Sequence, residues 1–320
     1  MKIVYNGELD SKTIKEVSGS TVIKLCEERP EVFYLDADLM SCIGTVAWGK
    51  QHPETAVDVG IAEANLVGVA AGMAAEGFKP IIHSFGPFIS RRAFDQAFLS
   101  AGYAKNSMTI LGSDPGVTAE YNGGTHMPFE DVALYREIPD SIVIDISDAA
   151  MFEDVLTQCI DIPGVKYLRF GRKTYPRIYE EGSHFEIGKA IELKPGKVLT
   201  IFVSGILVHE AMQAAEVLKN EGIDAAVVNI FTIKPIDIKA VSEYAKKTGA
   251  VLTVENHNYI GGLYSAVTDV LAKYCPVPAD YVAVEDRFGE VGEIEYLQEV
   301  FGLTKENIVD KSIKLVKRKG

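Results

Sequence analysis

Short apolar runs recur through the first half of the chain, separated by segments with helical periodicity. Continuous Val, Ile and Leu runs, as opposed to strict alternation, are typical of strands that are buried on both faces. We expect helices over residues 60–77, 91–105 and 149–160. The alternation predicts a doubly wound α/β domain over residues 1–175. The predicted strands lie in VFYLDAD, KPIIHSF, SMTILGSD, SIVIDIS and VKYLRFG.

The alternation of predicted strands and helices ends after the last of these apolar runs. The segment RKTYPRIYEEGSHFEIG mixes Pro, Gly and charged residues without clear periodicity, which predicts a linker over residues 176–192. A second α/β domain is then expected over residues 193–320. Its amphipathic helix LVHEAMQAAEVLKNEG ends at Gly222, a suitable C-cap. Its predicted strands lie in KVLTIFVSG, DAAVVNIFTIKPID, AVLTVEN and DYVAVED.

Composition fits this picture and removes several classes of function. The chain has 320 residues, enough for about two domains, and a net charge of -13 that argues against non-specific nucleic-acid binding. The N-terminus lacks a signal-peptide pattern, and the longest apolar run is too short to span a membrane. We therefore expect a cytoplasmic chain that has no membrane partner. Four scattered cysteines predict neither a zinc site nor a disulfide framework: Cys26, Cys42, Cys159 and Cys275.

Common catalytic motifs are missing from the sequence. It contains no P-loop, no G-x-G-x-x-G, no G-x-S-x-G and no H-E-x-x-H. A generic nucleotide-binding module would need a glycine loop that cradles phosphate. That reading is therefore unsupported.

A carboxylate in an apolar stretch is the strongest chemical signal. Glu63 opens the helical run EANLVGVAAGMAA and shares a face with Val67, Ala70 and Ala74. A carboxylate on that face would lose its hydration and needs a partner. The plainer reading is that Glu63 caps the helix or reaches solvent. The alternative is that it shares a proton with a buried heteroaromatic nitrogen.

Four segments, in order along the chain, resemble the transketolase group of thiamine diphosphate enzymes. GIAEANLVGVAAGMAAEGFKPIIHSFGPFISRRAFDQ resembles the pyrimidine-binding domain, and GGTHMPFEDVALYREIPDSIVIDISDA resembles its G-P-T-H-x-P-x-E block. VVNIFTIKPID and VENHNYIGGL resemble the transketolase C-terminal domain. The resemblance runs from about residue 19 to 315. The whole chain resembles the C-terminal subunit of a split transketolase. It implies a pyrimidine-binding domain followed by a C-terminal-type α/β domain.

The resemblance also implies a second chain. The family's diphosphate-binding domain carries G-D-G followed by an Asn, and this sequence has no G-D-G. We therefore expect an N-terminal subunit to supply Mg²⁺, the diphosphate site and the other wall of the active site, with no metal ligands in this chain. By analogy with the family we expect self-association into an α2β2 assembly.

By this resemblance, Glu63 bonds or protonates the aminopyrimidine N1′ and so activates the cofactor for transfer of a two-carbon ketol unit from a ketose to an aldose. Phe85 and Phe88 would stack on the aminopyrimidine ring, and Asp38 would lie near the cofactor. A third family aromatic falls near Arg91, so that wall of the pocket differs.

The substrate residues are partly retained. His126 in GGTHMP matches a histidine that bonds the donor ketose, and Arg172 matches an arginine that binds a sugar phosphate, with Arg169 as its rival. Ser113 stands where the family has a phosphate-contacting His, and Asn122 where it has an Asp that reads a donor hydroxyl. The pattern predicts thiamine diphosphate chemistry on a sugar or sugar phosphate, and it leaves open both the usual pentose phosphates and a differently substituted ketose or ketose phosphate.

Other readings share part of this pattern. A β-subunit of a 2-oxoacid dehydrogenase, or a protein like deoxyxylulose-phosphate synthase, would also have Glu63, the aromatic pocket and the C-terminal domain. A non-catalytic assembly subunit would keep the fold but would not need Glu63 and His126. We interpret His257 in VENHNYIGG as structural or interfacial.

Overall fold

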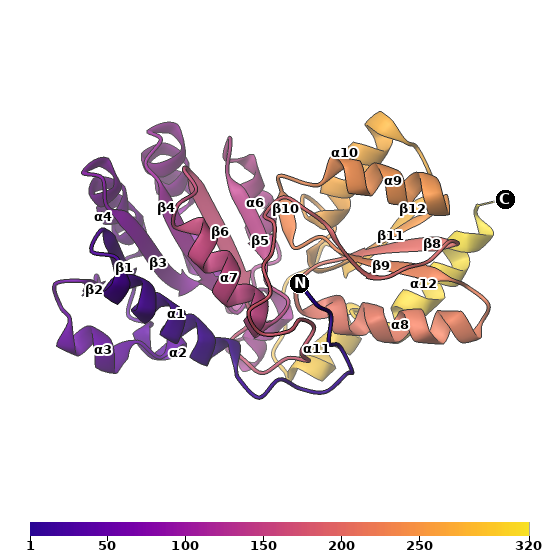
Figure 1. The fold of residues 1–320 in the computed structure, drawn as a ribbon, viewed down its shortest axis with the longest axis horizontal. Helices are drawn as coiled ribbons and strands as arrows, with labels where there is room; N and C mark the ends of the chain where they lie inside the picture. The colour runs from indigo at the N-terminus through magenta and orange to yellow at the C-terminus, as the bar shows by residue number, and fades with distance from the viewer. Residues whose placement is uncertain (320) are drawn as a thin grey trace.

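The computed structural model describes residues 1–319, which form two α/β units side by side (Figure 1). The first unit is built on a seven-stranded sheet and the second on a five-stranded sheet. Both sheets are mainly parallel, which confirms the α/β class. Among residues 1–319, no helix is both long enough and apolar enough to span a bilayer.

The first sheet contains all five strands that the apolar runs of the first half predicted. Its order is β10-β5-β6-β4-β3-β1-β2, and only β10 is antiparallel to its neighbour. Every residue of β4 and β6 is buried, as expected for strands covered on both faces. The strands are β1 (Val32–Asp36), β2 (Ala56–Asp58), β3 (Lys79–Phe85), β4 (Met108–Ser113), β5 (Ile142–Asp145), β6 (Val165–Phe170) and β10 (Thr232–Lys234).

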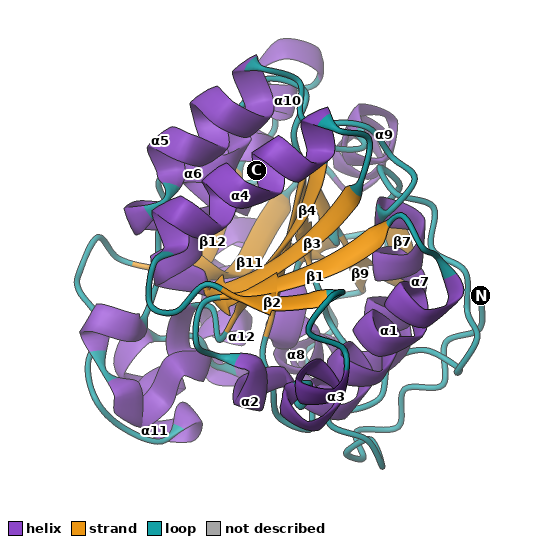
Figure 2. Ribbon diagram, turned by 90° about the vertical axis from the view of Figure 1, so that its left-hand side faces the viewer, coloured by secondary structure: helices purple, strands orange, loops and turns teal. Residues whose placement is uncertain are grey.

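Helices cover both faces of this sheet (Figure 2). A capping box between Thr13 and Glu16 starts the first helix, which the sequence analysis did not single out although it carries this signal. The helix expected over 91–105 is instead a pair of π-helical segments, Phe88–Arg92 and Ala97–Tyr103, around a single α-turn. The α-helices are α1 (Ile14–Glu28), α2 (Met40–Ile43), α3 (Val46–Gln51), α4 (Glu63–Ala75), α5 (Phe94–Gln96), α6 (Asp131–Glu137) and α7 (Ala149–Cys159).

The second unit has strand order β12-β11-β8-β9-β7, with β7 antiparallel at one edge. Its strands are β7 (Ile191–Lys194), β8 (Leu199–Val203), β9 (Ala225–Asn229), β11 (Val251–Asn258) and β12 (Ala279–Val284). Its helices are α8 (Val208–Asn220), α9 (Ile238–Thr248), α10 (Leu263–Tyr274), α11 (Ile294–Phe301) and α12 (Lys305–Lys317).

The two units are joined more closely than a simple linker would join them. Between β6 and β7 the chain is irregular and runs beside the N-terminal residues, with backbone bonds such as Val4 N to Ile178 O. β7 begins at Ile191, inside the range 176–192 expected for the linker. β10 comes from the second half of the chain and completes the edge of the first sheet (Figure 1). The polypeptide therefore crosses between the units more than once.

Candidate active site at the carboxyl end of the first sheet

Glu63 is the first residue of α4, and its side chain is 1% exposed. Val67 and Ala70 on the same face are buried, as the periodicity predicted, whereas Ala74 is only half-buried. The carboxylate does not reach solvent. Instead, Arg92 Nη1 donates to Glu63 Oε2 at 2.7 Å, and Ser84 Oγ lies 3.5 Å from Oε1. This ion pair compensates the lost hydration of the carboxylate.

The sequence analysis did not identify Arg92. Its only signal was the adjacent pair Arg91-Arg92, and the π-helical turn sends the two side chains to different partners. Arg92 lies over the Phe88 ring, 4.4 Å from its centroid. Arg91, expected at the pocket wall, donates to Thr125 O at 2.9 Å and pairs with Glu130.

Two neighbouring phenylalanine rings meet a histidine from a later loop, and Arg92 links this cluster to the carboxylate. Phe85 ends β3, Phe88 begins the π-helical segment, and His126 lies in the loop after β4. The centroid of His126 is 6.1 Å from that of Phe85 and 5.0 Å from that of Phe88. Both phenylalanines are half-buried, so they leave ring surface free for another flat group.

Arg172 approaches the same rings from the end of β6. Its guanidinium carbon lies 5.1 Å from the Phe85 centroid, and Nε and Nη2 both donate to Asp114 Oδ2, at 2.8 and 2.5 Å. Burial raises the pKa of Asp114, and Arg172 opposes that shift. Arg169, the alternative candidate for binding a sugar phosphate, is 1% exposed, and its guanidinium group donates to residues of both units. Arg172 is thus the arginine that remains accessible.

Ser113 is buried and contacts a histidine that the sequence analysis did not single out. Its Oγ lies 3.0 Å from His83 Nε2, and His83 Nδ1 lies 2.7 Å from Asp36 Oδ2. Asp36 also accepts from the Tyr34 hydroxyl and the Leu39 amide. These side chains come from the ends of β1, β3 and β4, which are neighbours in the sheet. Ser113 is therefore part of a buried hydrogen-bonded group of side chains, and its predicted contact with the substrate stays a prediction.

Asp38 and Asn122 are both exposed. Asp38 has a positive φ of 62°, and its amide donates to Asp58 Oδ1 at 2.9 Å. In the described part of the chain, no hydrogen bond or ion pair ties either side chain to the ring cluster. The predicted contacts of Asp38 with the cofactor and of Asn122 with the donor stay predictions.

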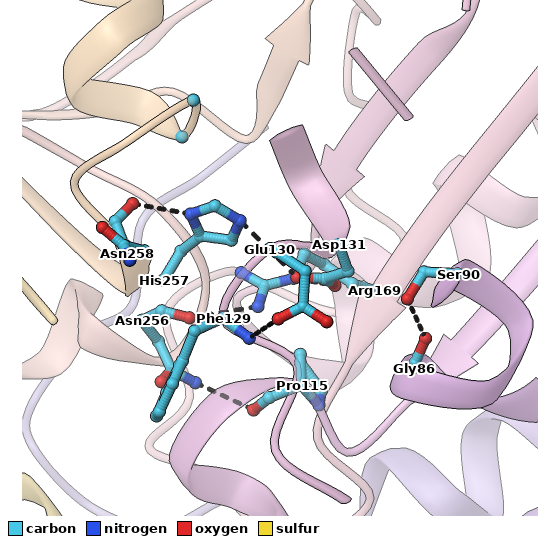
Figure 3. Close-up of polar contacts among 12 residues, drawn as sticks. Gly86, Ser90, Pro115, Phe129, Glu130, Asp131, Arg169, Asn256, His257 and Asn258 are labelled. Atoms are coloured by element: carbon cyan, nitrogen blue, oxygen red, sulfur yellow. Dashed lines mark hydrogen bonds and ion pairs between the residues drawn. The ribbon is translucent and has the colours of Figure 1, made fainter. Parts of the chain in front are cut away.

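The second unit bonds to the loop after β4, which carries His126, and Figure 3 shows this contact between Asn256 and Pro115. Asn256 Oδ1 accepts from Val117 N, and Asn256 Nδ2 donates to Pro115 O, both at 3.0 Å. Further along the loop, Glu120 has a strained backbone, with φ 48° and ψ -122°. Lys173 pairs with its carboxylate at 2.6 Å. Contacts from both units therefore fix this loop.

His257 lies at the same junction, as its interfacial interpretation requires (Figure 3). Its Nε2 is 3.8 Å from Asp131 Oδ1 of the first unit, and burial lowers its pKa to about 4. Glu255 accepts from the amides of Leu263 and Tyr264 at the start of α10, and burial raises its pKa to about 8. Among residues 1–319, neither side chain contacts the ring cluster through a hydrogen bond or ion pair.

The residues present fit one end of the expected cofactor. Half-buried aromatic faces beside a buried carboxylate suit a flat ring that carries nitrogen acceptors. Within residues 1–319, no group of three or more His, Cys, Asp or Glu side chains is placed to hold a metal ion. The aromatic rings and the carboxylate therefore suit the pyrimidine end of the cofactor.

Comparisons with known proteins agree with this arrangement. Residues 10–177 match the family model of the transketolase pyrimidine-binding domain, and residues 188–308 match that of the transketolase C-terminal domain. A 6-deoxy-6-sulfo-D-fructose transketolase subunit from Clostridium sp. (strain MSTE9) is 44% identical over 98% of each chain. A putative transketolase C-terminal section from Methanocaldococcus jannaschii is 34% identical over 96% of this chain and 97% of its own.

One solved structure is similar along almost its whole length. It is a split-gene transketolase, described as an inactive β4 tetramer, with a TM-score of 0.89 and 37% identity. The alignment covers 96% of this chain and 99% of that chain. The two-domain order expected from the sequence motifs is confirmed by these matches.

Proposed function

The chain belongs to the transketolase family, and we propose that it is the pyrimidine-binding subunit of a two-chain transketolase that transfers a two-carbon ketol unit from a ketose to an aldose. The carrying observation is a carboxylate, Glu63, that is 1% exposed and whose ion-pair partner, Arg92, lies over the half-buried Phe88 ring. Thiamine diphosphate, when bound, supplies the nucleophilic carbon for this chemistry. This chain supplies the group that holds a proton at the pyrimidine ring.

Each residue of the ring cluster has a role in this proposal. Glu63 holds the proton at N1′, and Phe85 and Phe88 bind the flat pyrimidine ring. His126, beside both rings, bonds the donor's oxygen atoms, and Arg172 receives the far end of the sugar. Arg92 balances the buried charge of Glu63, and its half-exposed side chain is free to move when a ring binds.

The proposed donor is a ketose that differs from the usual pentose phosphates. The Ser113 hydroxyl is buried and lies against His83, and Arg172 is already paired with Asp114. Because both side chains have partners within the chain, they form a weak site for a phosphate. The relative with 44% identity carries the name of a sulfofructose transketolase subunit. We therefore select 6-deoxy-6-sulfofructose as the first donor to test.

A partner subunit is part of the proposal. The sequence lacks the family's G-D-G motif, and a second chain that carries G-D-G and the following Asn would complete the diphosphate and magnesium site. Two related proteins support a partner subunit. One is named as a subunit of a transketolase, and the other is described as a split-gene transketolase. We propose a cytoplasmic α2β2 assembly with active sites between unlike subunits.

The decisive experiment uses the co-purified complex, with thiamine diphosphate and Mg²⁺. Glu63→Gln removes the proton that Glu63 exchanges, so deuterium exchange at the reactive cofactor carbon and donor turnover should both fall by about 10² or more. Glu76→Gln, at the exposed end of the same helix, is the matched control and should leave both rates unchanged. Unchanged exchange in the Glu63 variant would refute the proposal.

Two further arms of that experiment separate the other readings. Carbon dioxide release from pyruvate without ketose cleavage would favour a 2-oxoacid dehydrogenase or deoxyxylulose-phosphate-synthase-like reaction. Failure of the complex to bind the cofactor in a calorimetric titration would favour a non-catalytic assembly subunit.

A further inference from the structure

Arg91 lies beside the ring cluster and bridges two points of the chain that follows β4. It belongs to the same π-helical segment as Phe88, and its side chain is 43% exposed. Nη2 donates to the backbone carbonyl of Thr125 at 2.9 Å, and Nε lies 2.8 Å from Glu130 Oε1. A planar guanidinium can hold both partners at once, because its N–H groups point in fixed directions. Arg91 therefore connects the two ends of the segment 125–130.

His126 lies inside this bridged segment. The far end of the segment is tied back on itself, since Glu130 Oε2 accepts from the Phe129 amide at 2.8 Å (Figure 3). Burial raises the pKa of the Glu130 carboxyl, and the positive charge of Arg91 opposes that shift. The contacts of Asn256 act on an earlier part of the same loop. The bridge from Arg91 is thus a separate restraint, placed next to His126.

The bridge reaches the His126 ring through Thr125. Thr125 Oγ1 lies 2.9 Å from His126 Nδ1, and the rings of Phe85 and Phe88 meet the imidazole edge to face. Among residues 1–319, His126 Nε2 makes no hydrogen bond. The imidazole is therefore held at Nδ1 and by the two phenyl rings, and Nε2 is the nitrogen that is left for a ligand.

We propose that Arg91 is a positioning residue, which fixes Thr125 and thereby holds His126 with Nε2 toward the oxygen atoms of the donor. This inference rests on the proposed transferase function. A small displacement of a group that orients the substrate lowers the rate strongly, because the reacting atoms must be held in a near-attack geometry. Within residues 1–319, no hydrogen bond or ion pair joins Arg91 to Glu63, so cofactor activation should not depend on Arg91.

The test measures single-turnover cleavage of a donor by the assembled complex loaded with thiamine diphosphate and Mg²⁺, with 6-deoxy-6-sulfofructose and fructose 6-phosphate as the two donors. Arg91→Ala should lower the second-order rate constant for the better donor by about tenfold. Deuterium exchange at the reactive cofactor carbon, which depends on Glu63, should keep its wild-type rate. Arg177→Ala is the matched control, because Arg177 also donates to a backbone carbonyl, that of Tyr179, and it should leave both rates unchanged.

A double-mutant cycle separates positioning from direct contact with the donor. His126→Ala removes the ring that is positioned, so adding Arg91→Ala to it should lower the rate constant no further. Donor affinity, measured by calorimetric titration, gives the same cycle where cleavage is too slow. Losses that add in the double variant would show that Arg91 acts on the donor itself, and they would overturn the inference.

Hydrogen exchange of the complex needs no donor. Arg91→Ala should speed exchange at the His126 amide, which donates to Gly123 O, and should leave exchange at the Val117 amide, which is bonded to Asn256, unchanged. Wild-type exchange at His126, or wild-type cleavage, in the Arg91 variant would overturn the inference. A wild-type complex that cleaves neither donor would refute the proposed function, and the exchange measurement would still decide whether Arg91 holds the segment around His126.

Discussion

The pairing of Glu63 with Arg92 is the central feature at the scale of single residues. A buried carboxylate without a partner is costly, whereas a guanidinium at 2.7 Å makes its burial possible. Because Arg92 is 48% exposed, water reaches it and weakens the pair relative to a fully buried one. Such a partner can leave when a ligand takes its place.

Removing Arg92 should therefore destabilise the chain to a moderate degree. We expect Arg92→Ala to lower the free energy of unfolding by about 1–2 kcal/mol, because it leaves Glu63 buried and unpaired. Urea denaturation measures this change. Adding Glu63→Gln to Arg92→Ala should recover most of the loss, since a neutral amide costs less to bury.

The neighbouring arginine supplies the control for this experiment. Arg91 and Glu130 form an ion pair with both side chains substantially exposed, so Arg91→Ala should cost less than about 1 kcal/mol. Equal losses for the two single variants, or no recovery in the double variant, would contradict our account of Glu63.

At the scale of elements, the loop after β4 is shaped by residues outside it. Asn256 of β11 bonds to both sides of Gly116, where a side chain would collide, since a Cβ would lie 2.2 Å from Asn256 Oδ1. Gly116 also has φ +55°, a conformation that favours glycine. The second unit thus sets the path of the loop that carries His126.

Loss of this clamp should loosen the loop without affecting the cofactor ring. We expect Asn256→Ala to raise the donor KM by about tenfold with unchanged cofactor affinity, because each lost hydrogen bond is worth about 1 kcal/mol. Hydrogen exchange at the Val117 amide should become faster. Steady-state kinetics of the complex and exchange mass spectrometry measure these two effects.

A nearby asparagine on the same strand is the matched control. The Asn258 side chain bonds to Asp286 and Ile260, and the bond of its backbone amide to Phe129 O does not depend on that side chain, so Asn258→Ala should leave Val117 exchange unchanged. Wild-type exchange and wild-type KM in the Asn256 variant would show that the clamp does not position the loop.

At the scale of the whole molecule, a buried arginine network joins the two units. Arg169 donates to Asp131 and Asp145 of the first unit and to the Asn256 carbonyl of the second (Figure 3). Ser204 of the second unit also donates to Asp145. Together with β10 in the first sheet, these contacts predict that both units unfold in one transition.

Truncation of Arg169 should therefore destabilise the whole chain. Arg169→Ala leaves two buried carboxylates unpaired and should cost about 3–5 kcal/mol. Arg29→Ala, which also removes an arginine from two acids but at the surface, should cost less than about 1 kcal/mol. Calorimetry measures both losses, and equal values would contradict a joining role for Arg169.

Much of this architecture was predictable because it depends on local pattern. The strands follow from apolar runs whose residues are buried on both faces, and α4 follows from periodicity that also places Glu63 inside. Motif order predicted the family and the two domains. The π-helical form of residues 88–103 was not predictable, since an i→i+5 turn leaves no distinct periodicity over so few residues.

By itself, the sequence determined the α/β class, the family and the residue types available for chemistry, because side-chain periodicity and motif order are properties of neighbours along the chain. Tertiary structure alone decided which charges meet. Arg92 reaches Glu63 across 29 positions, Arg172 reaches Asp114 across 58, and Asn256 reaches Val117 across 139. Such contacts depend on where the sheet and its connections place each element. The local pattern of residues does not specify which distant positions will meet.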